Sequence, residues 1–218
     1  MQRKLTVLLA SVVLLIALVT IVRWSRPAMP LISPAPFAGL GQRLAVETIK
    51  AVNGHGKIVV VISAFHQLSG NPAHAAWESF QSGLKKNSSV SLTATEVVGA
   101  DPDELVIGSG CSGAQLQAIL TKYAAADAIV FLIGLPEWGT LQSRGMTLPP
   151  GPAKIIVAVD GAVPTKTEYG GYFSNRFLAV LVTKRPGSTA TVTSRIPPES
   201  LDQYYQVYTP QNADTLPE

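Results

Sequence analysis

Lys57-Ile58-Val59-Val60-Val61-Ile62-Ser63 is an unbroken run of β-branched residues between two polar ones. Such a run is typical of a strand buried on both faces, as the strands of a parallel sheet are. Residues 127–133 and 154–159 repeat the pattern. Residues 90–98 are predicted to form a further strand, and residues 177–183 a fifth that is a candidate for an edge position.

Helical patterns alternate with these strands. Residues 37–52 carry apolar side chains at three- and four-residue spacing and end at a glycine, and residues 72–86 begin with a proline in the first turn. Ser112-Gly113-Ala114-Gln115 has the form of a capping box that opens a third helix. Alternating strands and helices predict a doubly wound, mainly parallel α/β sheet of about five strands, covered by helices on both faces.

The order of these elements resembles the amino-terminal lobe of the type I periplasmic sugar-binding proteins over about residues 55–165. The resemblance rests on the first strand with Asn71-Pro72 and a helix after it, on Asp101-Pro102, on the helix and strand of residues 115–130, and on the fourth strand ending at Asp160. It implies a Rossmann-like lobe. It also implies that an asparagine and aromatics after the first strand, and an acid–arginine pair after the fourth, contact a sugar between two lobes.

The chain departs from that pattern at three points. Ala73 and His74 occupy the positions of the aromatics, and Gly161 stands where the arginine is usual. The residues after 165 are too few for a second lobe. The resemblance therefore carries over Asn71 and Asp160 alone as ligand contacts.

The first 26 residues are predicted to be a membrane anchor. Residues 5–22 contain no charge and no proline and would form about 27 Å of helix, close to the hydrocarbon core of a bilayer. Basic residues flank the segment, and we expect it to be retained rather than cleaved as a signal peptide, because no small-x-small site follows it. The predicted anchor residues include Leu5, Leu14 and Val22 within the apolar segment and Trp24 at the membrane interface. We expect the amino terminus inside the cell and the main domain in the periplasm.

Three further segments follow the anchor. Residues 27–36 contain four prolines and are expected to be a stiff linker. Residues 37–196 form the α/β domain, and residues 197–218 are expected to be an extended tail. Three tyrosines of this tail are candidate docking residues, on a partner or on the chain's own domain: Tyr204, Tyr205 and Tyr208.

Composition excludes several classes of function. The chain has 218 residues, and 14% of them are charged against an average of about 25%. Four of its seventeen bases lie in the first 26 residues, which hold no acid, so thirteen bases face fourteen acids in the remainder. We therefore expect no nucleic-acid partner, because such binding needs a clustered excess of Lys and Arg.

Cofactor and metal motifs are weak. The single cysteine, Cys111, excludes an internal disulfide or a cysteine-rich metal site. Residues 108–113 have the glycine spacing of the dinucleotide-binding motif. They follow the second predicted strand, whereas that motif follows the first strand of its sheet. The histidines His55, His66 and His74 lack the spacing of a helical metal pair. We expect no cofactor, no metal and no catalytic residue.

Four residues are candidate ligand contacts at the carboxyl edge of the sheet, where open α/β folds bind ligands: Asn71, Asp101, Trp138 and Asp160. Two functions remain open. The first is a non-catalytic, membrane-anchored structural or interaction subunit on the periplasmic face of an inner-membrane complex for transport, respiration or photosynthesis, with the lipid bilayer and other subunits as partners. The alternative is a small-ligand binding or sensor protein, for a sugar-like molecule or a nucleotide.

Overall fold

Residues 57–63 lie in β1 (Gly56–Ser63), inside a six-stranded sheet. The computed structural model describes residues 35–99, 110–149, 151, 153–159, 164–185 and 200–218. Val59 and Val61 face one layer of helices, while Ile58, Val60 and Ile62 face the other. The run is unbroken because both faces of the strand are buried.

The strand order is β2-β1-β3-β4-β5-β6. The first five strands are parallel: β2 (Val90–Val98), β1, β3 (Ala128–Phe131), β4 (Lys154–Val159) and β5 (Leu178–Lys184). The last, β6 (Tyr205–Tyr208), is antiparallel to β5. The mainly parallel α/β fold is confirmed, with one strand more than expected, and β5 is not an edge strand.

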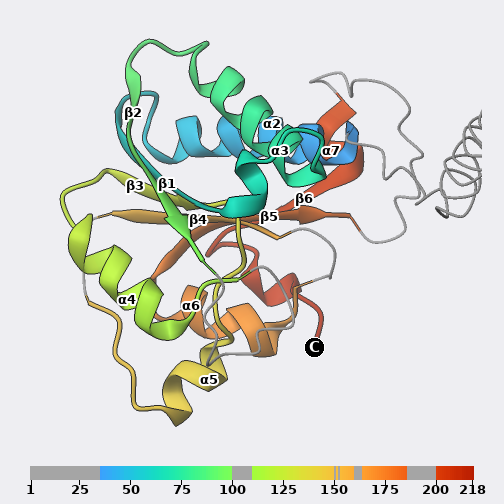
Figure 1. Ribbon diagram of the computed structural model, residues 1–218. Coiled ribbons are helices and arrows are strands. Elements are labelled where there is room, and N and C mark those ends of the chain that lie inside the picture. Colours follow the sequence, from blue (N-terminus) through green and yellow to red (C-terminus); the bar gives the residue numbers. More distant parts are fainter. Residues whose placement is uncertain (1–34, 100–109, 150, 152, 160–163, 186–199) are drawn as a thin grey trace, which may run out of the picture. The chain divides into compact units, whose positions relative to one another are not determined.

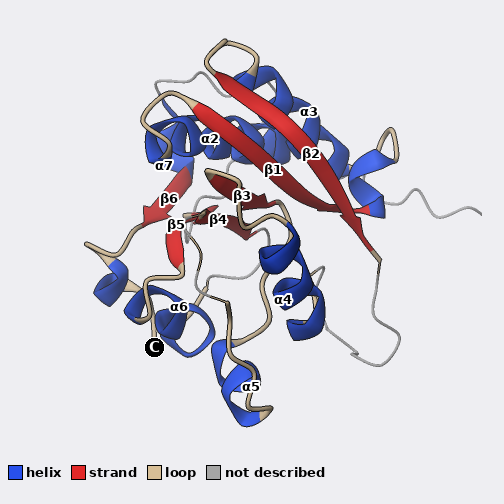
Figure 2. Cartoon of the chain, turned by 90° about the vertical axis from the view of Figure 1, so that its left-hand side faces the viewer, coloured by secondary structure: helices blue, strands red, loops and turns tan. Residues whose placement is uncertain are grey.

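Two layers of helices cover the sheet, as Figures 1 and 2 show. One face is covered by α2 (Ala35–Ala51), α3 (Pro72–Leu84) and the short α7 (Leu201–Tyr204). The other is covered by α4 (Gly113–Lys122), α5 (Trp138–Ser143), η2 (Lys166–Gly170) and α6 (Gly171–Ser174). The short turns η1 (Ala64–Gln67) and η4 (Ala213–Thr215) complete the described elements.

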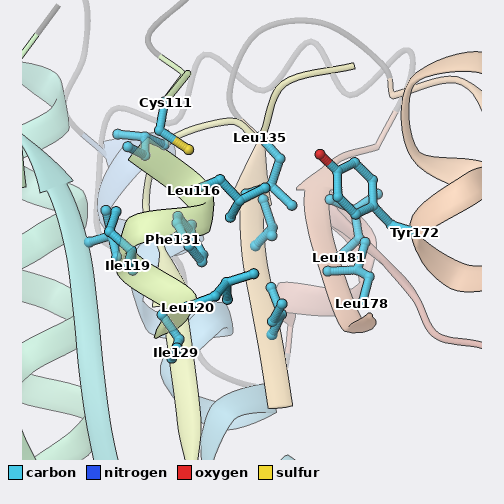
Figure 3. Close-up of a cluster of buried hydrophobic side chains, with 14 of the residues drawn as sticks. Cys111, Leu116, Ile119, Leu120, Ile129, Phe131, Leu135, Tyr172, Leu178 and Leu181 are labelled. Carbon is cyan, nitrogen blue, oxygen red and sulfur yellow. The ribbon is translucent and has the colours of Figure 1, made fainter. Parts of the chain in front are cut away.

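The predicted capping box at the start of α4 is confirmed. The Ser112 hydroxyl accepts the backbone N–H of Gln115 at 3.2 Å, and the Gln115 side chain accepts the N–H of Ser112 at 2.8 Å. This cap fixes where α4 begins. In Figure 3, Leu116 and Leu120 of α4 lie alongside Phe131 and Ile129 of β3, and together they form part of one buried core.

Helices α2 and α3 touch through small residues. A Cβ atom built on Gly41 would overlap the carbonyl oxygen of Ala76 and lie only 3.0 Å from its Cα, and one on Gly83 would lie 2.5 Å from the Cβ of Ala45. The two backbones therefore approach more closely than any larger side chain permits. Leu44 and Phe80, both fully buried, fill the space between this helix pair and the sheet.

The carboxyl-terminal segment differs from the extended tail that the sequence suggests. Tyr205 and Tyr208 lie in β6 and are 3% and 2% exposed, and the Tyr205 hydroxyl donates to the carbonyl of Pro36. The backbone N–H of Lys166 donates to the carbonyl of Pro217 at 2.7 Å. These two tyrosines are therefore buried in the chain's own domain, the second of the two docking alternatives, while Tyr204 is half-buried.

Residues 169–173 are helical although they contain two successive glycines. The Thr165 hydroxyl accepts the backbone N–H of Glu168, and the Glu168 carboxylate accepts the N–H of Thr165 at 2.9 Å, which starts η2. The two glycines, Gly170 and Gly171, continue the helix into α6. Glycine is required at position 171 because the Trp138 ring lies directly against it and leaves no space for a Cβ.

Several predicted residues lie outside the described ranges. They are the anchor residues Leu5, Leu14, Val22 and Trp24, the site candidates Asp101 and Asp160, and most of the linker. Its last two residues, Ala35 and Pro36, form the start of α2. Among the described residues, none of the helices combines the length and apolar character needed to cross a bilayer.

Candidate functional site at the carboxyl edge of the sheet

The strand order reverses direction between β1 and β3. From β1 the chain enters α3, on one face of the sheet, and reaches β2; from β3 it enters α5, on the other face. The connections that leave the carboxyl ends of these two neighbouring strands therefore diverge. In open α/β sheets such a divergence creates the crevice in which ligands bind.

His66 bridges the two strands at this position. It belongs to η1, the turn that follows β1, and it is 4% exposed. Its Nδ1 atom accepts the backbone N–H of Ser63 at 3.3 Å and lies 2.9 Å from the Ser63 hydroxyl, and its ring also bonds the backbone of Leu132, directly after β3. One side chain thus links the carboxyl ends of β1 and β3.

This geometry fixes the protonation of the His66 ring. Because a backbone N–H only donates, Nδ1 must be the unprotonated nitrogen. The proton of the neutral ring is therefore on Nε2. Burial lowers the pKa of His66 below its ordinary value, although the hydrogen bond to Leu132 partly opposes the shift. The ring is therefore held neutral.

His74, in the first turn of α3, supports the same turn. Its Nδ1 atom lies 2.7 Å from the carbonyl oxygen of His66, so it is the donor in that hydrogen bond. Its Nε2 atom lies 3.3 Å from a carboxylate oxygen of Glu78, one helical turn further along. The two histidines that the sequence separates by eight residues therefore meet through the backbone of η1.

The outer surface of η1 is apolar. Phe65 is 58% exposed and Leu68 is 55% exposed, the two highest values among the exposed large hydrophobic residues of the described chain. Both side chains flank His66, whose own ring points inward. An exposed phenyl ring at a ligand edge of this fold offers a flat surface for an apolar face of a ligand.

Of the four predicted ligand residues, two are described. Asn71 caps α3: its side-chain oxygen accepts the N–H of Ala73 at 2.9 Å, so that oxygen is engaged in the helix start. Trp138 begins α5 and packs edge-on against Tyr172 at 4.9 Å between ring centroids and against Phe177 at 6.0 Å. Its ring is partly buried and packs against the core on that side of the sheet.

Sequence reasoning missed the role of Phe65, His66 and Leu68. The signal was present, since these residues directly follow the strongest strand of the chain. Their importance depends on β3 being the neighbour of β1, which the order of elements alone does not reveal. Among the described residues, no group of acidic, histidine or cysteine side chains could hold a metal ion.

A groove of about 520 Å³ lies elsewhere, between α2 and α3. It is lined by small and polar residues, among them Gly39, Gln42, Ser82 and Lys86. A smaller hollow of about 200 Å³ lies beside Leu120 and Phe177. Neither contains η1 or the bridge made by His66. We place the candidate site at the carboxyl edge because the topology and the exposed apolar pair coincide there.

Comparison with known proteins supports the fold. No protein-family model matches the sequence, and no curated protein matches it significantly. Solved structures do match. An ABC transporter solute-binding protein from Burkholderia graminis, in complex with D-arabinose, matches over 83% of this chain and 62% of its own, with 15% identity and a TM-score of 0.51. AraP, an arabinose-binding protein from Geobacillus stearothermophilus, matches over 84% and 63%, with 12% identity and a TM-score of 0.50.

The α/β domain has the fold of a type I periplasmic-binding lobe. The resemblance that the sequence indicated over residues 55–165 is confirmed at the level of fold, and the match extends beyond it. The chain spans less than two thirds of the length of these sugar-binding proteins.

Proposed function

We propose that this periplasmic-binding lobe binds a small sugar-like ligand at its carboxyl edge. The observation that carries the proposal is the placement of Phe65 and Leu68, both more than half exposed, in the turn that follows β1, one of the two strands between which the strand order reverses. The buried bridge of His66 holds the turn that presents them. An exposed aromatic ring is suited to a sugar, which has apolar faces and polar edges.

The comparisons support this function over that of a structural subunit. The two solved proteins named above are a D-arabinose complex and an arabinose-binding protein. Pentoses are therefore the first ligands to test. The described lobe, tested by itself, covers one side of a ligand and leaves the other side open, whereas tight small-molecule sites enclose 70–90% or more of the ligand surface. We expect a dissociation constant on the order of 1 mM, or about 4 kcal/mol of binding free energy.

The ligand prediction is tested on the domain from residue 35 onward. Calorimetry or ligand-observed NMR with a panel of pentoses, hexoses and polyols is expected to detect binding of at least one sugar. Phe65→Ala should weaken that binding about five- to tenfold, because it removes the stacking surface. Val46→Ala is the matched control, since Val46 is an exposed apolar residue of α2, and its affinity should equal that of the wild type. Equal affinities of the Phe65 variant and the wild type would refute the role of η1.

The same proposal includes a membrane tether. Residues 5–22 are uncharged and long enough to span a bilayer, and we propose that they hold the lobe on the periplasmic side. Full-length protein is expected to stay in the membrane fraction after alkaline carbonate washing and to dissolve only in detergent. Protein that lacks residues 1–26 should move to the supernatant. If the full-length chain is washed off by carbonate, the tether is excluded.

A further inference from the structure

An apolar hollow of about 200 Å³ lies at the amino edge of the sheet, opposite the edge that carries η1. Its lining includes Ile129 and Ile155, the second residues of β3 and β4, and Phe177, which directly precedes β5. We propose that this hollow binds a small carboxylic acid, whose apolar group fills the hollow and whose carboxylate pairs with the guanidinium of Arg176. The site is separate from the one proposed for the sugar and does not depend on it.

The floor of the hollow is buried and apolar. Leu120 of α4, Ile129 and Ile155 line it, and all three are buried. Ile129 and Ile155 are direct neighbours in the sheet, and Figure 3 shows Leu120 beside Ile129. A cavity of about 150 Å³ lined by such side chains stays dry and binds benzene in another protein. The hollow therefore suits an apolar group of about the size of a benzene ring.

The rim of the hollow carries a positive charge. Ala124, Asn175 and Arg176 line it and are exposed, and Arg176 is the one charged residue among the described lining residues. Within the described part of the chain, no acid pairs with Arg176. Asp127, at the same edge of the sheet, accepts the backbone N–H of Lys57 at 2.7 Å. A guanidinium without an ion pair beside an apolar hollow matches an anion with a compact apolar group, and its planar fork fits a carboxylate.

The backbone at Arg176 is in a conformation that disfavours an arginine. Its φ is +60°, in the left-handed region. Arg176 follows α6, and its N–H donates to the Phe173 carbonyl at 2.9 Å. The N–H of Phe177 donates to the Tyr172 carbonyl at 2.9 Å. This is the Schellman motif, in which glycine is the usual residue at the left-handed position. Side chains held in such a conformation occur preferentially at functional sites, so we assign a binding role to the Arg176 side chain.

The same conformation makes a direct test possible. Arg176→Gly removes the guanidinium and relieves the left-handed strain, so this variant should fold and be at least as stable as the wild type. The probes are benzoate and benzyl alcohol, which carry the same ring and differ in charge. The protein is the domain from residue 35 onward, which contains the whole sheet and both of its helix layers.

Methyl NMR locates the bound ring. Benzoate is expected to shift the methyl signals of Leu120, Ile129 and Ile155 through its ring current and to leave those of Leu68, beside η1, unchanged. We expect a dissociation constant on the order of 1 mM. Benzyl alcohol should bind at the same place about three- to fivefold more weakly, because it lacks the charge that an exposed ion pair uses.

The variants separate the charge from the hollow. Arg176→Gly should bind benzoate about three- to fivefold more weakly than the wild type, whereas its affinity for benzyl alcohol should be unchanged. Lys85→Gln is the control, because it removes an exposed positive charge just after α3, on the other face of the sheet. This variant should bind benzoate as the wild type does.

Four results would overturn the proposal. They are methyl signals of the hollow that do not respond to benzoate, benzoate shifts confined to residues near η1, equal affinities of the wild type and Arg176→Gly for benzoate, and an equal loss of affinity in Lys85→Gln. The last result would mean that benzoate responds to net charge and not to Arg176. A failure of sugar binding leaves these measurements unaffected, because neither probe is a sugar and the two sites lie at opposite edges of the sheet.

Discussion

Gly41→Ala is expected to lower the free energy of unfolding by about 3 kcal/mol, although glycine-to-alanine changes inside helices normally stabilise by up to about 1 kcal/mol. The added Cβ would overlap the carbonyl oxygen of Ala76 on the neighbouring helix. That oxygen belongs to the backbone, so it cannot rotate away as a side chain can. The helices α2 and α3 must separate, and the buried contacts of Leu44 and Phe80 are loosened with them.

Chemical denaturation of the domain measures this loss. The control is Gly139→Ala, because Gly139 is also helical but has open space where its Cβ would lie, and this variant should be as stable as the wild type or slightly more stable. Gly83→Ala should also destabilise the domain, because its added Cβ would overlap the Cβ of Ala45 on α2. The double variant should lose less free energy of unfolding than the sum of the losses of the two single variants, because one separation of the helices relieves both overlaps. Wild-type stability of Gly41→Ala would mean that α2 and α3 do not pack as described.

Gly171→Ala is expected to cost about 2–4 kcal/mol and to displace the Trp138 ring. The new Cβ would lie within the ring itself, far inside van der Waals distance. The ring is already packed between Tyr172 and Phe177, so it has no free space into which it can shift without breaking those contacts. Because Tyr172 is fully buried and donates to the Pro136 carbonyl at 2.7 Å, the disturbance should spread into the core.

The adjacent glycine provides the control for this variant. A Cβ on Gly170 would meet only the Cβ of Lys166 at 3.7 Å, an ordinary contact, so Gly170→Ala should leave stability within about 0.5 kcal/mol of the wild type. Tryptophan fluorescence of Gly171→Ala should shift to longer wavelength as Trp138 becomes solvated, while Gly170→Ala keeps the native spectrum. Equal spectra and equal stabilities for the two variants would contradict the packing of Trp138 on Gly171. Removing the ring as well, in Trp138→Ala combined with Gly171→Ala, should recover part of the lost stability relative to the sum of the single changes.

The candidate site was less predictable than the fold. The sequence predicts Trp138 as a ligand contact because it follows β3 near the ligand edge. In the structure its partly buried ring packs against Tyr172 and Phe177, and its contact with a ligand stays a prediction. Asn71 was chosen from a family pattern, and it caps α3 through its oxygen. Capping and ligand binding use the same residue types, so residue type alone does not separate the two roles.

The sequence by itself determined the types of the long helices and strands of the α/β core, because these follow from local periodicity. An unbroken β-branched run is buried on both faces only in a covered parallel sheet, and β1, β3 and β4 have that pattern. Capping is equally local, and the box at Ser112 lies where the sequence predicts it.

Only the tertiary structure decided which distant segments meet. Tyr205 and Tyr208 carry no sign in the sequence that they form a sixth strand beside β5. His66 contacts the backbone of Leu132, sixty-six residues later, because that residue directly follows the neighbouring strand. The physical reason is that burial and hydrogen bonding between strands depend on strand order, whereas periodicity reports only how one segment meets its immediate surroundings.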